Sequence, residues 1–413
     1  MATIKKMPAI RFKGFDKEWG NDKLVNICNT FTDGDWIESK DQSFDGIRLL
    51  QTGNIGINKY LDKSNNAKWI NEYTFDKLNC KEVLEGDILI SRLPEPAGRA
   101  CIIPNRNIKM ITAVDCTIVR PSEKCQSKYL IQFLSSEPYF KEVVNFLAGG
   151  TRQRISRGNL ANFIVPLPDI NEQTQIGNYF KELDGSIQLQ EQKLEKVKNL
   201  KKAMLEKMFP TEGADVPEIR FKGFAEKWEK KELWEVGKIV GGGTPNTSNK
   251  EFWDGSINWY SPTEIGDKVY ANESIRKITQ LGLEKSSATI LPANRTVLFT
   301  SRAGIGYMAI LKSPGATNQG FQSLVLNEDC DSYFIYSMGF LIRNFALKYA
   351  SGSTFLEISG KTLEKMPITI PNPTEQTLIG NYFKKLDELI QSHEQKIEQL
   401  KHLKQALLQK MFI

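Results

Sequence analysis

Three arginines crowd the segment Ala148–Leu160, which reads AGGTRQRISRGNL. A guanidinium group can bind a phosphate or form two hydrogen bonds to the edge of a guanine. Grouping in one loop therefore favours a polyanionic ligand over isolated surface charges. From this loop we predict ligand contacts by Thr151, Arg152, Gln153, Arg154 and Arg157.

A similar loop recurs in the second half as Ala350–Leu363, ASGSTFLEISGKTL, with the same glycine-hydroxyl turn but less positive charge. Amide side chains can pair with adenine, and arginines close two matched strands. For each single residue the alternative is a solvated surface group or a local turn hydrogen bond. The further predicted contacts are Arg92, Arg99, Arg302, Asn318, Gln319, Gln322, Ser353, Thr354 and Lys361.

Motifs for catalysis are missing. Ser359–Thr362 has the tail of a nucleotide-binding loop, but Phe355 stands where its first glycine belongs. Gly241–Gly243 resembles a phosphate cradle only superficially, and no Asn-Pro-Pro-Tyr or Asp-Pro-Pro-Tyr box occurs. Both histidines lie in the last predicted helix, which argues against a His-rich metal site. A protein that recognises a long ligand but lacks catalytic residues should deliver that ligand to other subunits.

Composition is that of an ordinary soluble protein. The 413 residues are 40% apolar and 25% charged, with a net charge of +6 that permits a polyanionic partner. No apolar run is long enough to cross a membrane, and the six cysteines form no Cys-x-x-Cys pair. We therefore expect a cytoplasmic protein of two or three domains with reduced, structural cysteines and no membrane contact.

The segment Asn171–Phe209 recurs as Thr374–Phe412, with roughly 25 of about 40 positions identical. Apolar residues recur at steps of three and four, as in a coiled coil, so each copy predicts a helix of about 37 residues and roughly 55 Å. Asp169 with Glu172, and Asn372 with Glu375, have the spacing of capping boxes, and Pro373 suits the first helical position.

We expect these two helices to pair within the chain. Gln190 and His393 interrupt the apolar seam at equivalent places, and they would meet in either direction. Connectivity favours an antiparallel pair, because each helix follows its own globular half and the chain must return between them. Two solvated helices without a special partner are the alternative.

A second repeat opens each half. PAIRFKGFDKEW at residues 8–19 recurs as PEIRFKGFAEKW at residues 217–228, so the repeated unit is a whole domain followed by its helix. We predict an α+β protein with two mixed α/β domains, at residues 1–168 and 211–370, and long helices within 169–210 and 371–413.

Short β-rich runs at matched places support this frame. They occur at 86–92 and 295–302, 100–103 and 308–311, and 116–119 and 323–326, with helices expected around 128–146 and 332–349. The segments before the first pair of runs, at residues 32–62 and 241–267, barely align. One architecture presenting two different surfaces implies a long ligand with two unlike contact points.

The motifs together closely resemble the specificity subunit of type I restriction-modification systems. They are the P-x-I-R-F-x-G-F-x-x-x-W opening, the Ile-Ser-Arg and Thr-Ser-Arg strand ends, the glycine-Thr/Ser loop before an Ile-Ser step, and the Pro-x-x-x-E-Q-x-x-I-G helix starts. One departure is Pro94-Glu95-Pro96, where the second half has Ala303-Gly304-Ile305-Gly306, so Arg92 and Arg302 need not play the same role.

The resemblance implies two target recognition domains, each reading one half of a bipartite, asymmetric double-stranded DNA sequence. It further implies that the paired helices act as a spacer and as docking surface for two adenine-N6 methyltransferase subunits, and that motor-nuclease (R) subunits join. This chain would bind no cofactor, with S-adenosylmethionine, ATP and Mg on its partners. The rivals are a coiled-coil scaffold without a DNA role and a methyltransferase or nuclease with unrecognised motifs.

Overall fold

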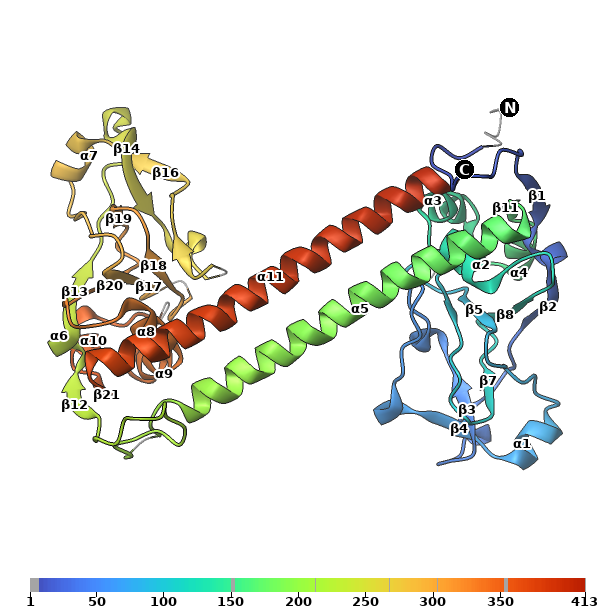
Figure 1. The fold of residues 1–413 in the computed structure, drawn as a ribbon, viewed down its shortest axis with the longest axis horizontal. Coiled ribbons are helices and arrows are strands. Elements are labelled where there is room, and N and C mark those ends of the chain that lie inside the picture. Colours follow the sequence, from blue (N-terminus) through green and yellow to red (C-terminus); the bar gives the residue numbers. More distant parts are fainter. Residues whose placement is uncertain are drawn as a thin grey trace. The chain divides into compact units, whose positions relative to one another are not determined.

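The computed structural model describes residues 7–149, 153–211, 213–266, 268–302, 304–352 and 356–412. It divides into two compact units, Met1–Glu191 with Gln395–Ile413, and Gln192–Glu394 (Figure 1). This division runs through both long helices, so the domain limits expected from the sequence stay a prediction. Each unit is described by itself.

The strands of the first unit form an inner and an outer sheet and two short ribbons. Their bounds are β1 Gly20–Lys23, β2 Cys28–Asp33, β3 Ile47–Leu50, β4 Lys68–Ile70, β5 Ile88–Ser91, β6 Ala100–Ile102, β7 Met110–Thr112, β8 Cys116–Pro121, β9 Leu147–Ala148, β10 Arg154–Ile155 and β11 Ile164–Leu167. The inner sheet is antiparallel in the order β2-β8-β5-β6. In the outer sheet β3 pairs antiparallel with β4 and parallel with β7. The ribbons are β1-β11 and β9-β10.

The second unit repeats the strand order of the first, with one additional strand at the edge of its inner sheet. Its strands are β12 Glu229–Glu232, β13 Gly237–Gly241, β14 Trp253–Tyr260, β15 Tyr270–Ala271, β16 Arg276–Ile278, β17 Thr296–Phe299, β18 Met308–Leu311, β19 Gly315–Thr317, β20 Gln322–Leu326 and β21 Pro367–Ile370. Its inner sheet runs β13-β20-β17-β18-β15 and its outer sheet β16-β14-β19. The six expected β-rich runs correspond to β5, β6, β8, β17, β18 and β20. In each outer sheet the central strand, β3 or β14, lies within the segment that barely aligns in sequence.

Alternate side chains of the central inner-sheet strands pack into apolar cores on opposite faces of the sheet. Ile88 and Ile90 of β5 belong to the apolar core shared with the helices, whereas Leu89 belongs to the core under the outer sheet. In the second unit Val297 and Leu298 of β17 divide in the same way. Because successive side chains of a strand point to opposite faces, a run of consecutive apolar residues is needed at the centre of three packed layers.

Each globular part has two helices where the sequence predicted one. The range 128–146 holds α2 Ser127–Phe133 and α3 Glu137–Asn145, because the Ser136 hydroxyl caps α3 and Pro138 cannot continue a preceding helix. The range 332–349 holds α8 Ser332–Ser337 and α9 Gly339–Tyr349, with a glycine, a poor helix former, at the break. The single-helix prediction is wrong in both halves. The other short helices are α1 Glu72–Lys77, α4 Arg157–Ala161, α6 Leu233–Val236, α7 Gln280–Glu284 and α10 Gly360–Glu364.

The two long helices are α5 Ile170–Lys207 and α11 Pro373–Met411 (Figure 1). The predicted first residue of α11, Pro373, is confirmed. Each predicted capping box forms only one of its two hydrogen bonds, the one accepted by the residue before the helix. Asp169 and Asn372 each accept a hydrogen bond from a backbone N–H of the first turn, at 2.9 and 3.0 Å.

The glutamates of those predicted boxes have other partners, because the opening motif of each half binds them. Arg11 donates two hydrogen bonds to the fully buried Glu172 carboxylate, at 2.8 and 2.7 Å, and Trp19 donates a third at 3.1 Å. Arg220 binds Glu375 with the same two distances. These hydrogen bonds raise the pKa of both arginines. The opening motif therefore fastens each long helix to its own globular part.

Two further positions of the helix-start motif fit each helix closely to its globular part. The Gln173 side chain accepts a hydrogen bond from the N–H of Gln126, and Gln376 accepts one from the N–H of Asp331. A side chain at Gly177 would clash with the backbone of the helix that begins at Ser127. Gly380 has the same tight neighbourhood in the second unit. Glycine is therefore required where α5 and α11 cross α2 and α8.

Within each unit the two long helices run antiparallel. In the first unit Lys401 binds Glu191 at 2.7 Å and Lys404 binds Asp184 at 2.6 Å, so partners ascend along one helix as they descend along the other. In the second unit the equivalent pairs are Lys198–Glu394 and Lys201–Asp387. The predicted antiparallel direction is confirmed. Gln190 and His393 belong to different units, so whether they meet stays a prediction.

An aromatic residue just beyond the end of each long helix is buried in a core. Phe412 packs against Trp19, Tyr129 and Phe180 in the first unit. Phe209 occupies the corresponding place in the second, with its ring 5.5 Å from that of Phe334. Burying such a ring contributes about 1.5–3 kcal/mol. The core of each unit therefore needs the end of one long helix and the start of the other.

We predict that Glu375→Gln lowers the free energy of unfolding of the second unit by about 3–5 kcal/mol, because Arg220 would keep a charge without its buried counter-ion. Urea unfolding followed by circular dichroism measures this change as a lower midpoint. The matched control is Glu388→Gln on the same helix, whose side chain is 61% exposed and ion-paired only to Lys384 at 4.0 Å. Equal midpoints for the two variants would contradict the assigned role of the Arg220–Glu375 pair.

Candidate nucleic-acid interface

A short β-ribbon holds the arginine loop of the first unit. Ala148 pairs with Arg154, and Leu147 with Ile155, so the loop closes between β9 and β10. The N–H of Ile155 also donates to the carbonyl of Arg92 at the end of β5, at 3.1 Å. The ribbon thus attaches the loop to the inner sheet. The predicted contacts Thr151 and Arg152 lie outside the described residues.

The structure leaves Gln153, Arg154 and Arg157 exposed around this ribbon. Ser156 caps α4, its hydroxyl accepting a hydrogen bond from the N–H of Asn159 at 3.0 Å, and Arg157 is the first residue of that helix. The Arg157 side chain is 51% exposed. A guanidinium in this position can contact a phosphate or a base edge.

Asp33 is a residue that sequence reasoning missed. Its carboxylate lies 3.7 Å from a guanidinium nitrogen of Arg157 and 3.5 Å from one of Arg92, and it accepts a hydrogen bond from the Thr117 hydroxyl at 2.8 Å. Asp33 therefore helps to position Arg157. No local motif could have indicated this contact, because Asp33 is far from Arg157 in the sequence.

Arg92 and Arg99 are buried, and their side chains form hydrogen bonds within the fold. Arg92 is 8% exposed and donates to the carbonyl of Val114 at 2.7 Å. Arg99 is 9% exposed, and burial lowers its pKa. Its guanidinium donates to four backbone carbonyls, those of Thr52, Ile55, Leu93 and Pro96. These placements argue against a direct ligand contact by either arginine.

The matched surface of the second unit is less positive. Glu357 occupies the place of Arg154, and its backbone pairs with Ser351 as that of Arg154 pairs with Ala148. Its carboxylate lies 3.8 Å from Arg302, which is 34% exposed and so more accessible than Arg92. Lys361 is exposed on α10, while Ser353 and Thr354 lie outside the described residues.

The amide residues lie on the turn between β19 and β20. The Asn318 side chain accepts a hydrogen bond from the N–H of Gly320 at 2.8 Å. Gln319 is exposed, and its side-chain oxygen accepts a hydrogen bond from the Thr244 hydroxyl, a partner that sequence reasoning missed. Gln322 is half-buried on β20. The glycines before Thr244 have a steric role, because a Cβ on Gly242 would stand 2.0 Å from the carbonyl oxygen of Asn318.

The side chains offer little for catalysis. Across the described ranges, no group of three or more His, Cys, Asp or Glu residues could hold a metal ion. The six cysteines are free thiols, and burial raises the pKa of Cys28, Cys101 and Cys125 to about 12. A thiol with so high a pKa is a poor nucleophile.

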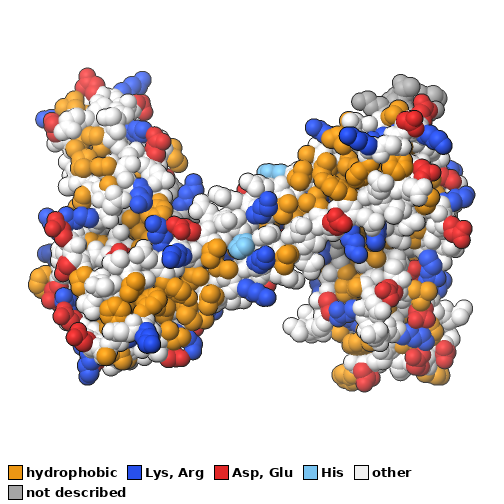
Figure 2. All heavy atoms as spheres, in the orientation of Figure 1, with side chains coloured by type: hydrophobic (Ala, Val, Ile, Leu, Met, Phe, Trp, Pro, Cys, Tyr) orange, Lys and Arg blue, Asp and Glu red, His pale blue; other side chains and the backbone are white. Residues whose placement is uncertain are grey.

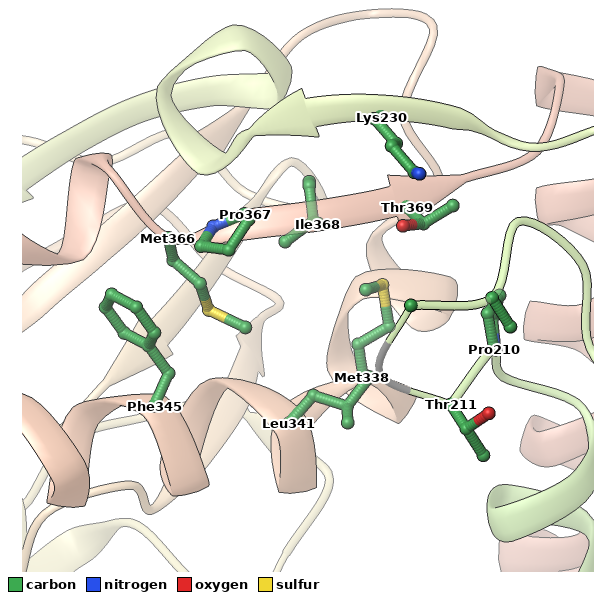
Figure 3. Close-up of a pocket in the computed structure, with 12 residues that line it drawn as sticks. Pro210, Thr211, Lys230, Met338, Leu341, Phe345, Met366, Pro367, Ile368 and Thr369 are labelled. Carbon is green, nitrogen blue, oxygen red and sulfur yellow. The ribbon is translucent and has the colours of Figure 1, made fainter.

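A cavity of about 390 Å³ opens in the second unit beside the segment that follows α5. Figure 3 shows Met338, Leu341 and Phe345 facing Met366 and Ile368 across it, with Lys230 on the adjoining strand. Its lining includes none of the predicted contact residues, and its apolar side chains provide no acid, base or nucleophile.

The fold defines a class of protein before any comparison is made: a duplicated α+β domain, each copy joined to one of two paired helices. Residues 16–199 and 225–402 each match the family model described as type I restriction modification DNA specificity domain. These matches cover well over half of the chain. The chain therefore belongs to this family and carries two of its domains, which confirms the resemblance seen in the motifs.

Individual proteins similar to this chain support the family assignment. The type I restriction enzyme MjaIX specificity subunit of Methanocaldococcus jannaschii is 34% identical over 190 residues, which are 45% of this chain and 44% of the relative, less than half its length. The HindI specificity subunit of Haemophilus influenzae is 20% identical over 401 residues, covering 80% of this chain and 85% of the relative. The crystal structure of a type I restriction-modification S subunit from M. genitalium has a TM-score of 0.65 at 13% identity, over 98% of this chain and 99% of that one, and shows the likeness of fold.

We predict that replacing Arg154 and Arg157 together by alanine weakens DNA binding by the first unit, because two exposed cations are removed near the phosphates. The logarithm of the binding constant should fall less steeply with the logarithm of salt concentration, by about 0.9 for each phosphate that is no longer neutralised. Fluorescence anisotropy at several salt concentrations measures this slope.

The control for that measurement is Arg295→Ala, which removes a cation from the second unit that is 48% exposed and paired with Glu328. Its salt slope should equal that of the unsubstituted chain. A double variant with an unchanged slope would exclude phosphate contacts by Arg154 and Arg157.

Proposed function

We propose that this chain is the DNA-sequence specificity subunit of a type I restriction-modification complex, and that it reads a bipartite, asymmetric DNA target with one half-site for each recognition domain. One observation carries this proposal: two units whose inner sheets share the order of four strands present unlike side chains at matched places. Arg154 of the first unit stands where the second has Glu357. Two copies of one surface would suit a symmetric target, whereas two unlike surfaces suit an asymmetric one.

The proposed complex contains two adenine-N6 methyltransferase subunits and motor-nuclease subunits in addition to this chain. S-adenosylmethionine, ATP and Mg would be bound by those partners, and this chain would act without catalysis or a cofactor, in the cytoplasm. The repeat supports two equal partners, since the helix-start motif and its buried arginine occur once in each unit. None of the described helices is both long and apolar enough to span a bilayer.

The proposed function is tested by mapping N6-methyladenine across the genome of the host with and without a working copy of this chain. We expect one asymmetric motif with two specified parts and an unspecified spacer, present only when the chain is intact. Methylation that is identical in both strains would contradict a specificity role.

A second experiment tests the spacer role of α5 and α11. We predict that inserting four residues into the middle of each helix adds about 6 Å of rise, which corresponds to about two base pairs of B-DNA. The methylated motif should keep both half-sites and gain about two unspecified positions between them. The control is an insertion of equal length in the segment that follows α5, at residues 210–211, where the spacer should stay unchanged. Altered half-sites with an unaltered spacer would exclude the proposed role of the helices.

A further inference from the structure

The outer lobe of the first unit, defined here as β3, β4, β7, α1 and the residues joining them, exposes large aromatic rings. Of the aromatic side chains in the described part of the chain, Trp36, Phe44 and Tyr73 are more than 70% exposed, at 71%, 103% and 72%. All three precede or follow strands of this one outer sheet. Single exposed apolar residues are ordinary, whereas large exposed apolar patches mark interaction sites.

Trp36 and Phe44 lie on the connection from β2 to β3, residues 34–46, which we name the acidic loop. Many hydrogen bonds hold it in place. Its first part is fixed to the inner and outer sheets by the N–H groups of Gly34 and Asp35, at 2.9 and 2.8 Å, and its last part by the N–H of Ser43, which donates to Trp69 of β4 at 2.9 Å. The fold therefore presents both rings on a fixed backbone, which lowers the entropy lost when a partner binds.

The charge of this loop favours one kind of partner. Residues 34–46 contain four carboxylates and one lysine, a net charge of −3. Asp35 lies 3.9 Å from Lys81 and Glu38 lies 2.7 Å from Lys40, but Asp45, next to Phe44, has no ion-pair partner among the described residues. Such a loop would be repelled by DNA phosphates. A protein surface rich in lysine and arginine would be attracted to it.

The second unit lacks an equivalent surface in its described residues. The corresponding connection from β13 to β14, residues 242–252, contains one lysine and one glutamate. The tryptophans of that outer sheet are buried, with Trp253 and Trp259 5.1 Å apart and Arg276 stacked 3.6 Å from the Trp253 ring.

We propose that the acidic loop docks onto a basic face of a protein partner, with Trp36 and Phe44 as apolar anchors and the surrounding carboxylates as the electrostatic match. In Figure 2 hydrophobic side chains lie beside acidic ones at the end of this lobe. Aromatic anchors surrounded by charge are typical of interface hot spots. Because the second unit has no such loop, this contact occurs once in each chain and distinguishes the two units. The identity of the partner rests on the proposed function: a methyltransferase subunit, which acts on DNA, would need a basic surface to face the DNA phosphates.

The test compares the full-length chain with its W36A/F44A double variant. The measured quantity is the dissociation constant for the methyltransferase subunit in the absence of DNA, followed by the fluorescence of a labelled chain. We expect the double variant to bind at least about tenfold more weakly, as when one interface hot spot is removed. D45N should weaken binding at low salt and reduce its salt dependence. The matched control is I275A, which removes an apolar side chain that is 86% exposed in the second unit and should bind normally.

Three results would overturn the proposal. One is an unchanged dissociation constant for W36A/F44A. Another is an unchanged constant for the partner with weaker binding of target DNA by the assembled complex, which would assign the rings to DNA. The third is a free chain that self-associates through these rings, shown by a mass in solution that falls in the double variant. Each leaves the DNA-reading function intact, whereas loss of that function would appear as methylation that does not depend on the chain.

Discussion

The buried pair between an arginine of the opening motif and a glutamate of a long helix is the constraint on which the rest of the structure depends. A carboxylate with no solvent exposure is stable only when its hydrogen bonds are satisfied, and Arg11 satisfies both oxygens of Glu172. Arg220 does the same for Glu375. The pair fixes where each helix starts against its globular part. The sheets and loops are then held in a set relation to that helix.

The paired helices extend this constraint. Equivalent lysines at 201 and 404 bind equivalent aspartates at 387 and 184, so the duplication of the sequence is repeated in the ion pairs. Asp184 also accepts hydrogen bonds from Asn58 and Gln132, and Asp387 accepts one from Tyr333. Each aspartate thus joins both long helices to a globular part. These interactions make each core depend on both helices.

The two units differ in sequence mainly at loops, where the shared sheets and helices tolerate differences. The inner sheets need apolar residues on both faces, while the ribbon after α3 and the loop after β2 need only to close their connections. The first unit can therefore carry Arg154 and the exposed Phe44 where the second carries Glu357 and a neutral connection. A duplicated frame with unlike loops provides two different contact surfaces on one architecture.

The sequence by itself determined the duplication, the long helices, the strands of the inner sheets and the family, because these depend on periodicity and local motifs. It also singled out the exposed Arg154 and Arg157. It did not indicate that Arg92 and Arg99 are buried, because their burial depends on carbonyls and carboxylates distant in the chain, and it read Glu172 and Glu375 as helix caps. Only the tertiary structure decided these partners and the ion pairs that align the long helices. A side chain's long-range neighbours are set by packing, and no short segment of sequence encodes them.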